Sequence, residues 1–239
     1  MDKGIKQSQK LLNRLIRSGV DLGPYLLEDG IIGPKTTYAF HKLENLLAPY
    51  MKTPPSLKNP VVAAIRMSDD LDNKFSDIMA LYALKESGAL LSALVPCSTK
   101  PSPVAEYTQR LYTVSGLSGV AIMAEGYYHQ IWKYSSGGWS GLPHWKQLLG
   151  PVTIYRDNIV NKRIDRSSPQ QSGFFGINLH SWRGWVSPVI GYWKDIKSGT
   201  GVSLSKGCQV VDADTLTDLL FFYKGKNLSY LLVHVSSLK

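Results

Sequence analysis

The spacing of hydrophobic residues predicts two helices at the start of the chain. Over residues 5–16, apolar side chains occur at positions 5, 11, 12, 15 and 16, which fall on one face of a helix, with Lys, Gln, Asn and Arg on the other faces; Gly19 ends the pattern. A second stretch of helical spacing, residues 34–47, begins at a proline, whose missing N–H costs nothing in a first helical turn. We therefore expect a helical unit over residues 1–50.

Beyond a Pro-rich linker, residues 51–60, the pattern changes to mixed helix and strand. Helical spacing predicts a helix over residues 69–87, a weaker one over 104–114 and another beginning near 212. Short apolar or alternating runs predict strands over residues 89–96, 119–124, 128–134, 152–156, 174–179 and 228–235. The pattern is typical of an α+β protein whose sheet-rich part comes after a helical unit.

The composition is that of an ordinary globular protein, with 44% hydrophobic and 19% charged residues. Lys and Arg outnumber Asp and Glu by 27 to 18, which gives a net charge of +9. Such a balance suits nucleic acid, an anionic membrane surface or the polyanionic bacterial wall. Because the chain has no basic block of the kind found in nucleic-acid-binding tails, we expect no nucleic-acid partner.

Neither a signal peptide nor a membrane span is predicted. The first residues lead into a polar, amphipathic segment and not into an apolar run. No stretch has the length of a membrane-spanning helix. We expect a protein made in the cytoplasm, which would need some means other than a signal peptide to reach a substrate outside the cytoplasm.

A histidine and a cysteine come directly after a predicted strand and a predicted turn. The apolar run 174–179 leads to His180 and Ser181, and the polar turn 205–207 comes directly before Cys208. An imidazole can take a thiol proton, and the thiolate is the reactive species. Taken alone, each residue has a commoner structural explanation, as a small buried side chain or a hydrogen-bonded ring. Together they predict a thiol nucleophile with its base.

The remaining candidates for metal or disulfide chemistry are weak. Cys97 is expected to be structural, because two thiols in a chain of this length make no disulfide framework. The histidines show no zinc-binding spacing. The acidic residues near Asp69 are expected to lie at a helix N-terminus, where negative charge is favoured. We expect neither a metal nor a cofactor.

The residues around His180 and Cys208 resemble the catalytic signature of the L,D-transpeptidase (YkuD-type) family. The matching segments are Ile177-Asn178-Leu179-His180 and Ser205-Lys206-Gly207-Cys208. The resemblance implies that Cys208 attacks a carbonyl of a peptidoglycan stem peptide and that His180 is its base. It also implies that Ser181 and Ser205 flank the site, and that Gly207 with Cys208 supplies backbone N–H groups to the oxyanion.

The match departs from the family pattern in three ways. His180 and Cys208 are 28 positions apart, a longer spacing than usual, and Lys206 stands where the family often has a histidine. Val210 stands where an arginine is usual, which leaves the recognition of a substrate carboxylate open. The Gly-Cys-Gln-Val variant is more similar to the phage-encoded branch of the superfamily.

Arginine and aromatic side chains are candidates for substrate binding. Arg156, Arg163, Arg166 and Arg183 could each bind a carboxylate, with solvated surface as the alternative. Trp182 lies in a Trp-rich insert and is expected to line a groove for glycan or peptide, with core packing as the alternative. Among these residues we expect Arg183 and Trp182, close to His180 in the sequence, to contact substrate.

The helical unit contains an Asp-Gly turn before its second helix. With the pattern from Gln9 onwards, the loop formed by Asp29, Gly30, Gly33 and Thr36 resembles the hallmark of the small three-helix peptidoglycan-binding domain. By itself such a turn is common. The resemblance implies wall binding through these four residues.

Together the two resemblances imply the fold of the whole chain. We expect a three-helix domain (1–50), a linker (51–60) and a mixed, β-rich L,D-transpeptidase-like catalytic domain (61–239).

Both resemblances point to one substrate, and they predict a peptidoglycan-acting cysteine enzyme. We expect a phage-encoded lysin, acting on the wall either after holin-dependent release or as part of the virion. The alternatives are an L,D-transpeptidase that forms cross-links or exchanges stem residues, and a non-catalytic wall-binding or virion structural protein. A sortase-like or papain-type cysteine enzyme is disfavoured by the sequence. Papain-type enzymes have their Cys before their His, the reverse of the order here, and a sortase has an arginine after its Cys, whereas no arginine follows Cys208.

Overall fold

The computed structural model describes residues 3–71, 75–86, 88–101, 120–137, 143–157, 161–181, 208–211 and 213–239. The helices in this part of the chain are α1 (Lys3–Arg17), α2 (Pro34–Leu47) and α4 (Ala213–Tyr223), with 3₁₀ turns η1 (Ala48–Tyr50) and η3 (Val235–Leu238). The strands are β1 (Val61–Arg66), β2 (Asp77–Lys85), β3 (Gly88–Ser98), β4 (Val120–Met123), β5 (Gly126–Ser135), β6 (His144–Gln147), β7 (Val152–Asp157), β8 (Gln171–Gly173), β9 (Leu179–Ser181), β10 (Gln209–Val211) and β11 (Leu228–His234).

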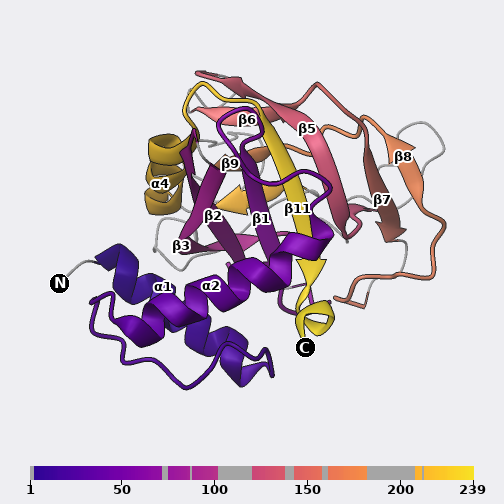
Figure 1. Ribbon diagram of the computed structural model, residues 1–239. Coiled ribbons are helices and arrows are strands. Elements are labelled where there is room, and N and C mark those ends of the chain that lie inside the picture. The colour runs from indigo at the N-terminus through magenta and orange to yellow at the C-terminus, as the bar shows by residue number, and fades with distance from the viewer. Residues whose placement is uncertain are drawn as a thin grey trace, which may run out of the picture.

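Eight strands close into a barrel in the order β1-β11-β5-β6-β9-β10-β3-β2, and β4-β7-β8 form a separate sheet beside it (Figure 1). The pairs β1–β11 and β9–β10 are parallel, and the other barrel pairs are antiparallel. These directions bring the last residues of β1, β11, β6 and β3 to the same end of the barrel as the first residues of β5, β9, β10 and β2. We call this the Arg66 end, after the last residue of β1.

The inside of the barrel is filled by large aromatic side chains. Trp132, Trp145 and Tyr230 are fully buried, and the rings of Trp132 and Tyr230 lie 4.6 Å apart. Helix α4 packs on the same core through Leu219 and Tyr223. The Tyr223 hydroxyl accepts a hydrogen bond from the Tyr82 N–H at 2.7 Å and donates to the Val61 carbonyl at 3.1 Å. Burial of these rings supplies much of the driving force for closing the barrel.

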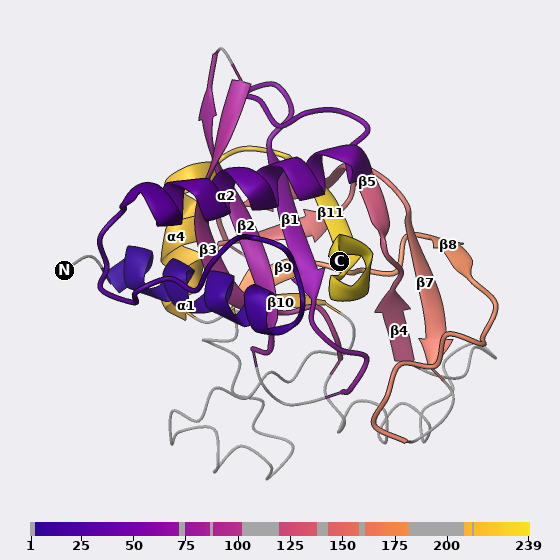
Figure 2. The ribbon, with the colours of Figure 1, turned by 60° about the horizontal axis from the view of Figure 1, so that its bottom comes forward.

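The N-terminal helices cover the outer face of the barrel, where they lie over β1, β2 and β3 (Figure 2). Leu12 and Leu43 belong to one buried cluster with Ile65 and Ala80 of those strands. Polar contacts add to this packing. The Ser8 hydroxyl donates to the Leu94 carbonyl at 3.3 Å and accepts from its N–H at 3.0 Å, and Glu44 accepts from the Leu91 N–H at 3.2 Å.

The expected three-helix domain followed by an L,D-transpeptidase-like catalytic domain is wrong as a description of this fold. In the described residues, the N-terminal unit has two helices and the turn η1, and the strands beyond it form a closed barrel and a separate sheet. The apolar faces of α1 and α2 pack on the barrel wall and not around a third helix. Periodicity in the sequence marks which face is apolar but not which element covers it. The division at residues 51–60 stays a prediction.

The predicted helix over residues 69–87 is also wrong, because residues Asp77–Lys85 form strand β2. The first six residues of β2 are all buried, since one face lines the barrel core and the other lies under the helices. A strand buried on both faces reads as a continuous apolar run that the sequence cannot separate from a buried helix.

The other assignments vary in outcome. The predicted strands that correspond to β3, β4, β5, β7 and β11 are confirmed, as is the helix beginning near residue 212. Of the strand predicted over 174–179, only Leu179 lies in β9. The helix predicted over 104–114 lies outside the described residues. No helix in the described part of the chain combines the length and apolar character needed to cross a membrane.

Candidate active site

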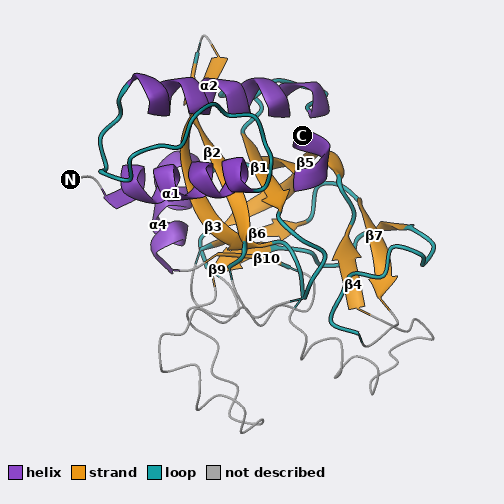
Figure 3. Ribbon diagram, turned by 90° about the horizontal axis from the view of Figure 1, so that it is seen from below, coloured by secondary structure: helices purple, strands orange, loops and turns teal. Residues whose placement is uncertain are grey.

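Strands β9 and β10 lie side by side (Figure 3). Their parallel pairing brings Cys208, the residue directly before β10, beside the segment that carries His180. Gln209 is paired with Leu179 and Val210 with His180, and the Gln209 N–H donates to the Asn178 carbonyl at 2.8 Å. The same register continued by one residue places Cys208 opposite Asn178. Residues 28 positions apart in the sequence therefore lie on, or directly beside, neighbouring strands.

Cys208 and His180 lie on the same side of the barrel wall. Side chains alternate along a strand, and Leu179 and Val211 belong to the inner core. His180, and Cys208 three positions before Val211, therefore lie on the outer side. In this register His180 is opposite Val210, two residues after Cys208, so the two residues are diagonal neighbours on this side.

The Cys208 thiol is half-buried and donates a hydrogen bond to the Gly176 carbonyl, with Sγ 3.6 Å from the oxygen. Burial raises the pKa of the Cys208 thiol above its ordinary value, and a backbone hydrogen bond at Asn178 opposes this. An S–H group that donates to a carbonyl is also favoured over the thiolate. The thiol therefore rests protonated at neutral pH.

The His180 ring is held by its own strand. Its Nδ1 lies 3.0 Å from the Ser181 carbonyl, which can only accept, so Nδ1 carries the proton and Nε2 is the basic nitrogen. Burial lowers the pKa of His180, and the bond to Ser181 partly offsets this. A neutral imidazole with its lone pair on Nε2 is the form that can take a proton from a thiol.

The barrel core supports both segments from inside, through residues that the sequence analysis missed. The Trp132 indole N–H donates to the Ile177 carbonyl at 2.8 Å, next to Asn178. The Tyr230 hydroxyl donates to Gln209 Oε1 at 2.6 Å, next to Cys208. Gln209 is fully buried, and its Nε2 has no hydrogen-bond partner among the described residues. The only signal in the sequence was the aromatic character of Trp132 and Tyr230, which does not distinguish core packing from such support.

Not all of the predicted site residues fall in the described part of the chain. Ser205, Gly207, Trp182 and Arg183 lie outside the described residues, so their roles stay predictions. Ser181 is buried in β9, where its carbonyl faces the His180 ring.

The predicted wall-binding loop is organised around Gln9, a buried residue of α1. Gln9 Nε2 donates to Asp29 Oδ1 at 3.0 Å and to Thr36 Oγ1 at 3.3 Å, and its Oε1 accepts from the Gly30 N–H at 2.8 Å. Gly30 has a φ of +77°, a conformation that favours glycine. Gly33 precedes the first residue of α2. The structure therefore brings Asp29, Gly30 and Thr36 together in contacts that fix the loop.

Fixing this loop leaves its apolar side chains at the surface. Tyr25, Leu27, Ile31 and Ile32 are all more than half exposed. Of the Asp29 carboxylate, Oδ1 already accepts hydrogen bonds from Gln9 Nε2 and the Ile31 N–H.

The three described candidate arginines differ in their partners. Arg163 pairs with Asp70 at 3.2 Å, and Arg166 pairs with Asp69 and Glu125, both at 2.7 Å. The expectation that the acidic residues lie at a helix N-terminus is wrong, because residues Asp77–Lys85 of the predicted helix form strand β2. Arg156 instead donates from Nε to the neutral Gln171 amide at 3.1 Å, and its guanidinium lies 5.3 Å from the centre of the Phe175 ring.

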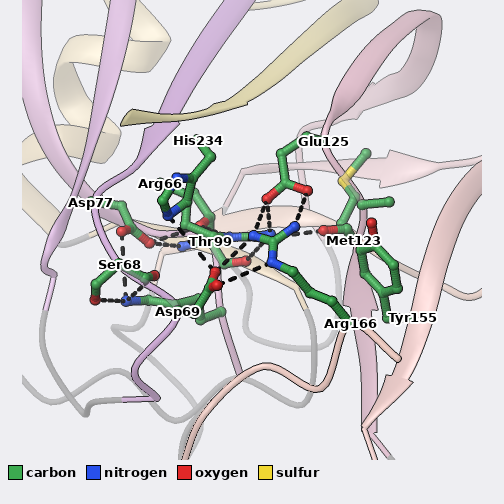
Figure 4. A network of polar contacts seen from close by, with 12 residues as sticks. Arg66, Ser68, Asp69, Asp77, Thr99, Met123, Glu125, Tyr155, Arg166 and His234 are labelled. Carbon is green, nitrogen blue, oxygen red and sulfur yellow. Dashed lines mark hydrogen bonds and ion pairs between the residues drawn. The ribbon is translucent and has the colours of Figure 1, made fainter. Parts of the chain in front are cut away.

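An ionic cluster occupies the Arg66 end of the barrel beside the separate sheet (Figure 4). Arg66 is fully buried and donates to Glu125 and to the Thr99 side chain and carbonyl. Although burial opposes ionisation, hydrogen bonds from Arg166 and the charge of Arg66 lower the pKa of Glu125 to about 2. An open cleft of about 320 Å³ lies over this cluster, lined by Asp69, Glu125, Arg166, His234, Ser236 and Ser237.

Comparison with known proteins gives no match: no family model, no curated protein and no solved structure is similar to this chain. Within the described residues, no three His, Cys, Asp or Glu side chains are grouped so that they could hold a metal ion.

Proposed function

We propose that the protein is a cysteine-dependent enzyme that acts on the stem peptides of bacterial peptidoglycan, with Cys208 as nucleophile and His180 as base. The observation that supports this most strongly is the β9–β10 register, which puts the two residues on the same side of adjacent strands. The protonation states agree with the roles, since the thiol holds its proton and the neutral ring can accept it at Nε2.

The reaction would proceed through a thioester. His180 Nε2 takes the Cys208 proton as the sulfur attacks the peptide carbonyl, and the tetrahedral intermediate collapses with loss of the amine, which takes the proton from His180. Water then hydrolyses the thioester in a lysin, whereas a second amine resolves it in a transpeptidase. We favour hydrolysis by a phage-encoded lysin, with the loop around Gln9 and its exposed apolar side chains contacting the wall.

A second candidate is a non-catalytic wall-binding or virion structural protein. The observation in its favour is the state of the thiol, which is half-buried, has a raised pKa and donates to a carbonyl. Structural cysteines are inert for these reasons, whereas reactive ones usually lie in electropositive surroundings that lower the pKa.

The test is mass spectrometry of purified peptidoglycan after incubation with the protein and two variants. We expect new stem-peptide termini with the wild type and with Cys97→Ala, whose thiol is fully buried in the barrel core, but none with Cys208→Ala. Glycan strands should stay intact. If Cys208→Ala and the wild type gave the same new products, the thiol mechanism would be refuted. If neither protein changed the peptidoglycan but both sedimented with it, the second candidate would be favoured.

A further inference from the structure

Gln147, the last residue of β6, is a buried polar residue that no motif marks. Its Nε2 donates to the carbonyls of Gly150 at 3.2 Å and Gly173 at 2.9 Å. Its Oε1 accepts from the N–H groups of Phe175 and Ile177, both at 3.0 Å. Because carbonyls lie at one end of the amide and N–H groups at the other, only one orientation of the side chain satisfies all of them.

These contacts fix the segment that faces the candidate nucleophile. The Gln147 N–H donates to Asn178 Oδ1 at 2.9 Å, so one residue holds the chain from residue 173 to residue 178. Gly176 lies between the two residues bound by Oε1 and has a φ of +70°, a conformation that favours glycine. Its carbonyl is the one that accepts the Cys208 thiol. The position of that carbonyl is therefore set by Gln147.

We propose that Gln147 is a positioning residue of the thiol site, which holds the Gly176 carbonyl against Cys208 so that the thiol stays protonated until it turns toward His180. The catalytic consequence rests on the function proposed above. The effect on the thiol itself does not, because it can be measured without any substrate.

The direction of the effect depends on which form of the sulfur the carbonyl favours. Burial is the main cause of the raised thiol pKa. A carbonyl oxygen also accepts from S–H and repels the thiolate, so losing it lowers the thiol pKa. When the pKa of the thiol falls by one unit, the fraction of thiolate at neutral pH rises about tenfold. A Gln147→Leu variant has a side chain of similar size but none of the hydrogen bonds that hold residues 173–177.

The experiment measures the alkylation rates of both cysteines in the full-length protein by iodoacetamide, from weakly acid to alkaline pH, with peptide mass spectrometry as the readout. In Gln147→Leu we expect Cys208 to react about tenfold faster at neutral pH, with its midpoint shifted to lower pH. Cys97, which is fully buried, should stay protected. The matched control is Gln170→Leu, an exposed glutamine whose Nε2 donates to the Tyr155 hydroxyl, and it should react like the wild type.

Gln147→Glu provides a second test if the leucine variant does not fold. A protonated carboxyl can still accept from the two N–H groups and donate to one carbonyl, whereas an ionised one faces two carbonyl oxygens. We therefore expect Cys208 to be protected as in the wild type at acid pH, and to lose that protection as the carboxyl ionises. A thiosulfonate reagent, which reacts at lower pH, extends the measurement to this range.

Two results would overturn the proposal. One is an unchanged Cys208 rate in folded variants, and the other is an equal rise at Cys208 and Cys97, which would mean general loosening of the fold. In an active enzyme, peptidoglycan turnover should fall in Gln147→Leu while alkylation rises, because His180 and the thiol lose their fixed geometry. If the wild type leaves the wall untouched but Cys208 still responds, the enzyme proposal fails and the positioning role stands.

Discussion

At the scale of single residues, the structure separates arginines that the sequence left equivalent. Arg163 and Arg166 direct their charge to aspartate and glutamate partners. Arg156 lies on the face of β7 shared with Ile154, which packs in the barrel core, and it stacks on Phe175, next to Gly176. Burial lowers the pKa of Arg156, as expected for a cation that gains no opposing charge from a carboxylate among the described residues.

We therefore expect Arg156 to bind a carboxylate of the peptide substrate. Within the described part of the chain its guanidinium donates only its Nε–H, to Gln171, which leaves the outer N–H groups for a bidentate contact. Arg156→Gln should raise KM for a stem peptide with a free carboxylate about tenfold or more, with little change for the same peptide as its carboxamide. Arg163→Gln is the matched control, because that side chain is exposed and paired with Asp70. Equal losses on both peptides would contradict the assignment.

At the scale of elements, local pattern was enough for α1, α2, α4 and five of the eleven strands in the described residues, but not for the site. The five correctly predicted strands are short apolar or alternating runs, whereas the apolar residues of β2 have a spacing that also fits a helix. Gly176, Gln147 and Trp132 contribute through contacts between distant segments, and a glutamine or tryptophan has no local signal for such a role. That His180 and Cys208 act together could be suspected from the sequence, but only the parallel register of β9 and β10 shows that they lie on the same side of neighbouring strands.

The ionic cluster couples the separate sheet to the barrel and should make this junction sensitive to acid. Arg66 of β1 donates to the Met123 carbonyl of β4 and to Glu125. The folded pKa of Glu125 is lowered from 4.5 to about 2, so its stabilising contribution is present above pH 4.5 and is lost as the pH falls toward 2. Glu125→Gln should lower the Tm near neutral pH. It should also reduce the decrease in Tm between pH 4.5 and pH 2, which calorimetry measures. Glu86→Gln, at an exposed turn, should show the wild-type slope.

At the scale of the whole molecule, the N-terminal helices and the barrel share one buried cluster. Leu43 of α2 and Leu231 of β11 are both fully buried within it. Two parts that bury their apolar surface against each other gain stability from the contact, so neither should unfold without weakening the other. This packing is the physical reason to doubt that residues 1–50 behave as a tethered, independent module.

We therefore predict that the helices and the barrel unfold in a single transition. All six tryptophans lie beyond residue 130, so their fluorescence reports on the rest of the chain, whereas circular dichroism at helical wavelengths is weighted toward α1 and α2. Leu43→Ala should cost about 2–5 kcal/mol and shift both signals together in urea, as should Leu231→Ala from the barrel side. Tyr38→Ala, on the exposed face of α2, is the control and should shift neither signal by a comparable amount. A Leu43→Ala variant that loses its helical signal at low urea, while tryptophan fluorescence keeps the wild-type midpoint, would show instead that the helical unit is independent.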